Sequence, residues 1–223
     1  MAFEGILTIN KPANITSYDV IRVIKKIIGK QKIGHAGTLD PFATGVLIVA
    51  IGKTFTKTLS TYQGMTKTYC FTIQLGQETT TLDPEGDIIL EKPIPENLTK
   101  DKIQETLHSF IGQTEQIPPA FSAKKINGQR AYKLARQGKD IELKPNIITI
   151  HDIELISYDA KTNQLECRVT CDKGTYIRSL SRDIAVKLDT VGYTKTLIRE
   201  AIGTYTIDTA VTIDKLETVL MPS

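Results

Sequence analysis

One aspartate and one histidine in a glycine-rich segment have the clearest chemical potential in this sequence. Residues 34–45 read GHAGTLDPFATG, which places His35 and Asp40 among three glycines. An aspartate is ionised at neutral pH and can act as a nucleophile. A structural alternative is open for each residue: Asp40 before Pro41 can form a turn, and His35 can be a polar loop residue. The residue types alone leave both interpretations standing.

Metal, disulfide and nucleotide chemistry are not indicated by the other reactive residues. The Gly34-x-x-Gly37 spacing suggests a phosphate cradle, but the Gly-Lys-Ser/Thr ending of a P-loop is absent. The three cysteines contain no Cys-x-x-Cys pair, and the three histidines lie far apart in the sequence. We therefore expect buried free thiols, no metal site and no cofactor.

Positive charge is concentrated in two stretches, although the net charge is only +3. Neither stretch contains an acidic residue, and such clusters can neutralise phosphates. A solvated helix face is an equally good explanation of each stretch taken alone. The first stretch contains Arg22, Lys25, Lys26, Lys30 and Lys32, and the second contains Lys124, Lys125, Arg130, Lys133, Arg136 and Lys139.

The segment around Asp40 follows a predicted helix and precedes a predicted buried strand. Thr16 and Asp19 have the spacing of a capping box, and the apolar residues that follow have a helical period up to Gly29. Residues 46–51 are continuously apolar and predict a strand. Residues 30–44, which have no clear period, are expected to form a loop, and loops on a rigid scaffold often carry catalytic residues.

The rest of the chain alternates strand and helix patterns with short connections. Strands are predicted at 5–9, 67–75, 147–158, 164–171 and 193–202, and helices at 99–111, 130–137, 176–188 and 212–220. Tight turns are expected at Asn127-Gly128 and around Asn163. This order favours an α+β fold with a mixed, mainly antiparallel sheet and helices packed on it.

Length and composition indicate one globular catalytic domain over residues 1–223. Hydrophobic residues make up 40% of the chain and charged residues 24%, which is ordinary for a protein with a sizeable core. No apolar run has the length of a membrane span, and the first residues do not resemble a signal segment. We expect a cytoplasmic protein without membrane association.

The sequence resembles the bacterial tRNA pseudouridine synthases of the B type, which modify uridine 55 in the T loop. The segment containing Asp40 resembles the family signature, which archaeal and eukaryotic relatives acting on rRNA share. Five further motifs occur in the same order as in the family, along nearly the whole chain. They are Lys11-Pro12 with Thr16-Ser17, Lys67-Thr68-Tyr69, Pro119 to Lys125 with the residues up to Gly138, and Lys173 to Leu180 followed by Leu197-Ile198-Arg199.

The resemblance implies a pseudouridine synthase fold and a role for each residue of the site. Asp40 is the expected nucleophile, Arg178 its partner, and Tyr69 the aromatic residue that stacks on the uracil. The expected substrate-binding residues are His35, Tyr176, Leu197 and Lys11. Structural alternatives stand for several of them: a surface ion pair for Arg178, and core packing for Tyr69 and Leu197.

The same resemblance implies that the substrate is the T arm of tRNA. A stacked base is out of reach of a buried carboxylate, so the uridine must be flipped out of its loop. The basic stretches are then predicted to contact the phosphates of the RNA. We also expect a monomer without an obligate protein partner. The predicted phosphate contacts are Lys25, Lys26, Lys30, Lys32, Lys124, Lys125, Arg130, Lys133 and Arg136.

Two departures and three alternatives accompany this interpretation. Asn14 stands where the family usually has glycine, and asparagine also tolerates a positive φ. The chain ends where many relatives continue into a small C-terminal RNA-binding domain of the PUA type, and we expect none here. The alternatives are a synthase acting on another RNA such as rRNA with a guiding partner, a non-catalytic tRNA chaperone, and a generic α+β RNA-binding protein.

Overall fold

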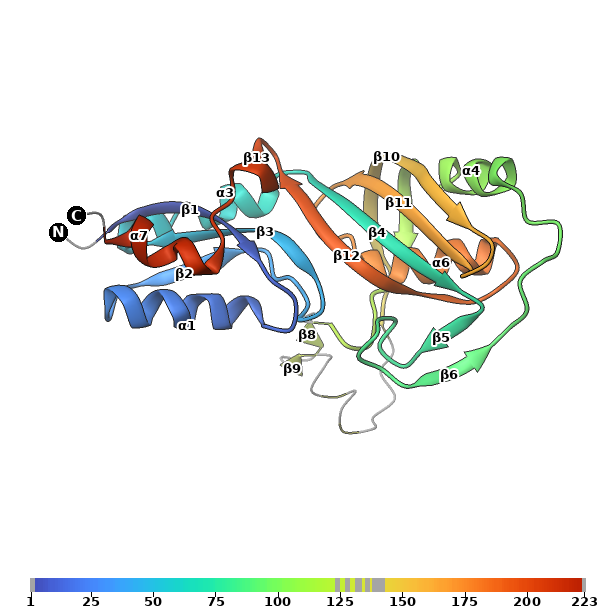
Figure 1. Cartoon of the computed structure of the whole chain (residues 1–223), viewed down its shortest axis with the longest axis horizontal. Coiled ribbons are helices and arrows are strands. Elements are labelled where there is room, and N and C mark those ends of the chain that lie inside the picture. The colour runs from blue at the N-terminus through green and yellow to red at the C-terminus, as the bar shows by residue number, and fades with distance from the viewer. Residues whose placement is uncertain are drawn as a thin grey trace. The chain divides into compact units, whose positions relative to one another are not determined.

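The structure, a computed structural model, describes residues 3–122, 125–126, 129–130, 134, 137 and 143–221. It divides into two compact units, shown in Figure 1. The first unit comprises Met1–Cys70 and Leu197–Ser223, and the second comprises Phe71–Thr196. Strands β4 (Lys67–Leu75) and β12 (Gly192–Ile202) contribute residues to both units.

The first unit is built on β1, β3 and the end of β12. Strand β1 (Gly5–Lys11) pairs antiparallel with β3 (Thr44–Ile51), and β3 pairs in parallel with β12 through Ile198 and Arg199. The remaining elements of this unit are β2 (Ile33–Ala36), β13 (Tyr205–Thr206), α1 (Ser17–Ile28), α2 (Lys53–Thr56), α3 (Leu59–Gly64), the 3-10 turns η1 (Ile207–Thr209) and η2 (Ile213–Lys215), and α7 (Leu216–Leu220).

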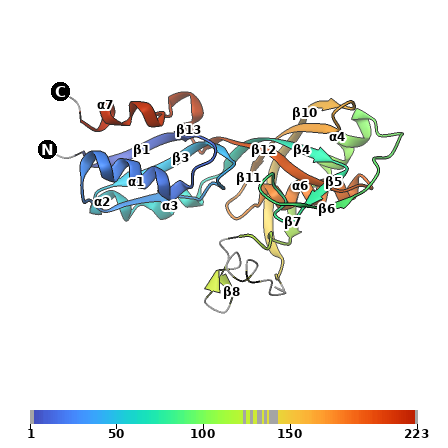
Figure 2. The same ribbon diagram turned by 60° about the horizontal axis from the view of Figure 1, so that its bottom comes forward.

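Successive side chains of β3 point to opposite faces of this sheet, and both faces are buried. Leu47, Val49 and Ile51 pack with α1 and α7 on one face. Val46 and Ile48 pack on the other face, where Leu59 and Tyr62 of α3 cover them. Figure 2 shows α1 and α3 along this sheet. A strand buried on both faces explains the continuous apolar run at 46–51.

Helix α1 begins where its capping residues predict. The Thr16 hydroxyl accepts from the backbone N–H of Asp19, and the Asp19 carboxylate accepts from the backbone N–H of Thr16. Those bonds satisfy amides that the first turn of a helix leaves unpaired. The Thr16 hydroxyl, which also donates to the Asp19 carboxylate, is the main cause that lowers the pKa of Asp19 to about 2; the Thr16 backbone N–H and Arg22 lower it further. The helix ends at Gly29, whose φ of 77° suits glycine.

The second unit is an antiparallel sheet with helices packed on it. Its strands follow the order β12, β4, β11 (Gln164–Cys171), β10 (Asn146–Asp159) and β7 (Gly112–Gln116). Helices α4 (Lys100–His108) and α6 (Ile177–Lys187) bury Leu107, Leu180 and Ile184. Two small hairpins complete it: β5 (Gln77–Thr79) with β6 (Ile88–Glu91), and β8 (Lys125–Ile126) with β9 (Gln129–Arg130).

The predicted α+β fold is confirmed, with a mixed and mainly antiparallel set of pairings. The hairpin around Asn163 is also confirmed, since β10 and β11 pair antiparallel and Asn163 has a φ of 58°. The prediction that residues 30–44 are loop throughout was wrong at 33–36, where β2 pairs antiparallel with β3. Residues 131–133 and 135–136 of the predicted helix, and Asn127-Gly128, lie outside the described residues.

Within the described part of the chain, no helix is long and apolar enough to cross a membrane. The single catalytic domain expected over 1–223 stays a prediction.

Candidate active site

The backbone on the C-terminal side of Asp40 is held by Lys11 and Asn14. Lys11 is completely buried, and its ammonium donates to the carbonyls of Pro12 (2.8 Å), Ile15 (2.8 Å) and Pro41 (3.2 Å). The N–H of Asn14 donates to the same Pro41 carbonyl at 2.8 Å, from a turn in which Asn14 has a φ of 65°. The turn predicted at Asn14 therefore fixes the residue after Asp40.

The backbone on the other side of Asp40 is held by Ser17. The Ser17 hydroxyl accepts from the N–H of Leu39 at 2.9 Å and donates to the Leu39 carbonyl at 3.2 Å. Ser17 is 1% exposed at the first position of α1. A helix end and a buried lysine thus hold the two neighbours of Asp40, which is itself half-buried.

Arg199 on β12 supports both ends of the segment around Asp40. Its Nε donates to the Val46 carbonyl at 2.7 Å, and its Nη2 donates to the Gly37 carbonyl at 3.0 Å. Gly45 has a φ of 101°, and a Cβ atom there would collide with the Arg199 backbone. Only glycine allows this close approach of β3 and β12. Arg199 is 2% exposed, so its guanidinium serves the interior of the loop.

His35 lies on β2 as a half-buried side chain whose pKa is lowered, which favours the neutral imidazole. Burial is the main cause that lowers its pKa, and the charge of Arg199 lowers it further, while the Gly37 backbone opposes the shift. Its Nδ1 atom is buried and has no hydrogen-bond partner among the described residues. The predicted role of His35 in binding the substrate stays a prediction.

Tyr69 and Leu197 are both buried residues of the first unit. Tyr69, 8% exposed, lies on β4, and Leu197, 6% exposed, lies on β12. Lys67 anchors the start of β4 by donating to the carbonyls of Gln63 and Met65. Packing in the core and a contact with a substrate base both agree with this burial, so the roles of Tyr69 and Leu197 stay predictions.

Arg178 lies in the second unit with a carboxylate and two carbonyls as acceptors. Its Nη1 donates to the Thr81 carbonyl (2.8 Å) and to Oδ2 of Asp83 (3.1 Å), and its Nη2 donates to the Phe121 carbonyl at 2.8 Å. The side chains of Arg178 and Asp83 are 5% and 4% exposed, which excludes the surface ion pair considered from the sequence. The predicted pairing of Arg178 with Asp40 stays a prediction.

Tyr176 comes directly before α6, two residues from Arg178. Its backbone N–H donates to Oε1 of Gln116 at 2.8 Å, and its carbonyl accepts from Nε2 of the same side chain at 3.1 Å. Tyr176 is half-buried, and no side chain caps α6 from this position.

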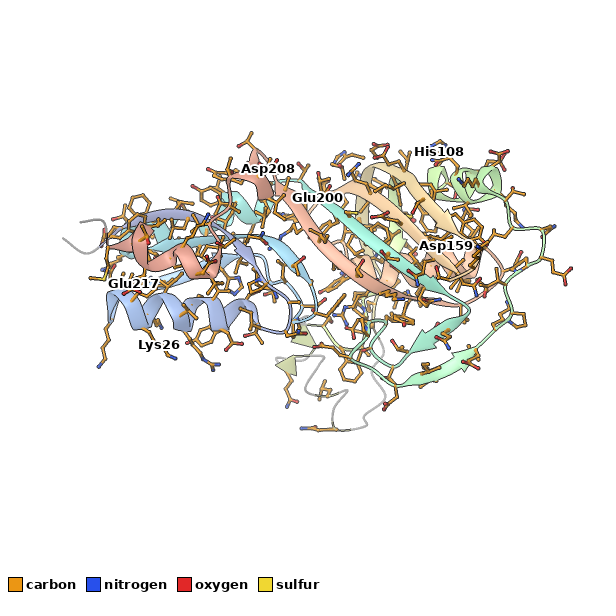
Figure 3. All side chains as sticks on the ribbon, viewed as in Figure 1. Lys26, His108, Asp159, Glu200, Asp208 and Glu217 are labelled. Carbon is orange, nitrogen blue, oxygen red and sulfur yellow. The ribbon has the colours of Figure 1, made fainter. Side chains whose placement is uncertain are left out.

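The first basic stretch lies on the exposed side of α1 and on the residues that follow it. Lys25, Lys26, Lys30 and Lys32 are all exposed, and Figure 3 shows Lys26 on the side of α1 away from the sheet. Arg22 and Lys25 also lie over the ring of Tyr18, at 5.0 and 5.9 Å from its centroid. In the second stretch, Lys124, Lys133 and Arg136 lie outside the described residues, as do the side chains of Lys125 and Arg130.

No role was predicted for Ser17, Arg199, Asp83 or Gln116. Ser17 and Arg199 do occur in the quoted motifs. A polar residue beside apolar ones was the feature that could have indicated a role for each. Among the residues that the structure describes, no group of three or more His, Cys, Asp or Glu side chains could hold a metal ion.

Comparisons with known proteins agree with this fold. Two solved structures, described as a Cbf5-Nop10-Gar1 complex and an archaeal box H/ACA sRNP Nop10-Cbf5 complex, give TM-scores of 0.72 and 0.69. Their sequences are 26% and 25% identical over 96% of this chain, which spans 55% and 53% of theirs. The fold is that of the pseudouridine synthases, and the protein belongs to this class of enzymes.

Sequence relatives identify the family. Residues 25–177 match the N-terminal domain of the TruB family of pseudouridylate synthases. The tRNA pseudouridine synthase B of Caldanaerobacter subterraneus subsp. tengcongensis is 43% identical, with 97% of this chain and 75% of the relative aligned. That of Aquifex aeolicus is also 43% identical, with 95% and 73% aligned. The chain belongs to the TruB family.

Proposed function

We propose that this protein converts uridine 55 in the T loop of tRNA to pseudouridine, with Asp40 as nucleophile. The observation that carries the proposal is that the residues on both sides of Asp40 are held in place. Ser17 bonds the backbone of Leu39, and Lys11 bonds the carbonyl of Pro41. A carboxylate on a fixed backbone pays little entropy to reach a reacting sugar. The relatives at 43% identity are named for tRNA, which favours tRNA over rRNA as the substrate.

The reaction exchanges one glycosidic bond for another within the same nucleotide. The bond between N1 and C1′ breaks, the uracil turns, and C5 bonds to C1′. C5 then loses its proton and N1 gains one, so substrate and product have the same composition. An ionised carboxylate beside C1′ is the group that this exchange requires.

The other residues receive the roles that the family resemblance implies. We infer that Tyr69 stacks on the flipped uracil, that Tyr176 and Leu197 wall its pocket, and that neutral His35 fills the space beside it. Arg178 is proposed to orient Asp40. Lys11 is proposed to act through the backbone, because its ammonium is buried against three carbonyls.

Exposed cations on and after α1 are proposed to bind the phosphates of the T arm. We further propose that the protein works in the cytoplasm as a monomer, with no obligate protein partner, cofactor or metal. An apparent molecular mass in solution near the 24.7 kDa of one chain would support the monomer.

The test is tritium release from tRNA labelled at C5 of uridine, because C5 loses its hydrogen only when it becomes the glycosidic carbon. Unmodified T-arm hairpin and whole tRNA serve as substrates, with a matched hairpin carrying cytidine at position 55 as the control. Stoichiometric release that depends on uridine 55 supports the proposal. Release from another position, or none from either substrate, would show that the target lies elsewhere.

A further inference from the structure

A buried amide side chain binds the backbone of Tyr176, the N-cap residue directly before α6. The Oε1 atom of Gln116 accepts from the Tyr176 N–H at 2.8 Å, and its Nε2 donates to the Tyr176 carbonyl at 3.1 Å. Gln116 is the last residue of β7 and is 2% exposed. One side chain therefore satisfies both polar backbone groups of Tyr176, across sixty positions of sequence.

These two hydrogen bonds are made at the N-terminus of α6, where the N-cap residue makes no side-chain capping bond. Tyr176 is the N-cap residue, with extended φ and ψ of −98° and 109°, and no side-chain cap bond is made there. Its carbonyl also accepts the first helical bond, from the N–H of Leu180 at 3.0 Å. Gln116 thus fixes the peptide groups from which the Tyr176 side chain departs.

The residues after Gln116 secure the next turns of the same helix. The Ile117 carbonyl accepts from the Ser179 hydroxyl at 2.8 Å and from Nη2 of Arg182 at 3.3 Å. The Phe121 carbonyl accepts from Arg178 at 2.8 Å. Of these hydrogen bonds between residues 116–121 and the start of α6, those of the Gln116 amide go to the backbone of Tyr176. The others are made by the side chains of Ser179, Arg182 and Arg178.

We propose that Gln116 is a positioning residue for the reaction, which sets the orientation of Tyr176 against the flipped uracil and the start of the helix that carries Arg178. This inference rests on the proposed roles of Tyr176 and Arg178. A displacement of about 1 Å in a residue that contacts the reacting group lowers rates by roughly a hundredfold. Overall RNA affinity depends less on one base contact, since phosphate contacts dominate it.

The first experiment compares Gln116→Met with Ser179→Ala by single-turnover tritium release at saturating hairpin, alongside melting temperature and hairpin affinity. Both variants lose partly buried hydrogen bonds between the same two segments, but only Gln116→Met removes the bonds to the backbone of Tyr176. We expect Gln116→Met to react roughly tenfold to a hundredfold more slowly, with affinity changed by less than about threefold. Ser179→Ala should keep the wild-type rate. Equal rates for Gln116→Met and wild type, or equal losses in both variants, would overturn the proposal.

A second variant keeps the proposal testable if Gln116→Met fails to fold. In Gln116→Glu, a protonated carboxyl can donate to the Tyr176 carbonyl and accept from its N–H, as the amide does, whereas an ionised carboxylate repels that carbonyl. The rate relative to wild type should therefore recover as the pH falls from 8 to 5.5. A large defect that stays the same over this range would overturn the positioning role. Tritium release by the wild-type protein tests the proposed function separately, because it does not depend on Gln116.

Discussion

The hydroxyl of Ser17 bonds both the N–H and the carbonyl of Leu39, at 2.9 and 3.2 Å. Leu39 directly precedes Asp40, so the first residue of α1 controls the backbone that leads into the proposed nucleophile. The neighbouring Thr16 caps the same helix without any described bond to Leu39. Substitutions at these two adjacent residues can therefore distinguish positioning of the loop, which involves Ser17, from stability of the helix, which involves Thr16.

We expect Ser17→Ala to slow single-turnover tritium release roughly tenfold to a hundredfold, since it loosens the backbone beside Asp40. It leaves two buried backbone groups unpaired, at about 1–3 kcal/mol each. Thr16→Ala should lose about 1 kcal/mol through the missing cap and keep its rate. Denaturant unfolding and rate measurement on both variants provide the check. Similar rate losses in the two would assign Ser17 to stability alone.

Asp40→Asn should abolish pseudouridine formation while folding and RNA affinity stay close to wild type. The amide is nearly isosteric with the carboxylate but has no nucleophilic charge. Tritium release over hours, thermal unfolding and hairpin binding are the measurements. Appreciable turnover by the variant would remove Asp40 from the reaction.

Arg178→Lys should lower the single-turnover rate at saturating RNA more than it weakens binding. A lysine keeps the charge, but it has no planar fork with which to reach Thr81, Asp83 and Phe121 together. Arg178→Met should cost about 3–5 kcal/mol of stability, because it leaves Asp83 buried without its arginine. Arg182→Lys, one turn further along α6, is the control and should keep the wild-type rate. An unchanged rate for Arg178→Lys would make Arg178 purely structural.

His35 should make the protein less stable in mild acid. Burial lowers its pKa in the folded state, so the unfolded chain takes up the proton first as the pH falls below about 6.5. The unfolded state then binds more protons than the folded state, and stability decreases until the pH passes the folded pKa. His35→Asn should show a smaller loss of melting temperature between pH 7.5 and pH 5 than wild type. An unchanged loss in His35→Asn would contradict the assignment.

Hairpin binding should weaken steeply with salt if the exposed cations contact phosphates. Each neutralised phosphate adds about one unit to the slope of log affinity against log salt. Lys26→Ala should lower that slope by about one without changing which uridine reacts. Lys161→Ala, in the turn between β10 and β11, changes the net charge equally and should leave the slope unchanged. Equal effects of the two substitutions would indicate attraction by overall charge.

The features that depend on near neighbours and on the order of the motifs were predictable from residue types and their spacing. The capping box at Thr16 and Asp19, the glycine end of α1 and the hairpin at Asn163 all involve residues within a few positions of one another. Local geometry of this kind depends on residue type and spacing, which can be read directly from the sequence. The ordered motifs around Asp40 likewise indicate the family, because a motif is defined by residue type and order alone.

The residues that hold the proposed reacting groups could not be predicted, because they lie far from those groups in the sequence. Strand β2 escaped prediction because its hydrogen bonds go to β3, and no periodicity inside residues 33–36 shows that partner. Ser17 meets Leu39 across 22 positions, Gln116 meets Tyr176 across 60, and Arg178 meets Asp83 across 95. Residue spacing carries no record of such pairs, because the folded chain brings them together through the packing of whole strands and helices.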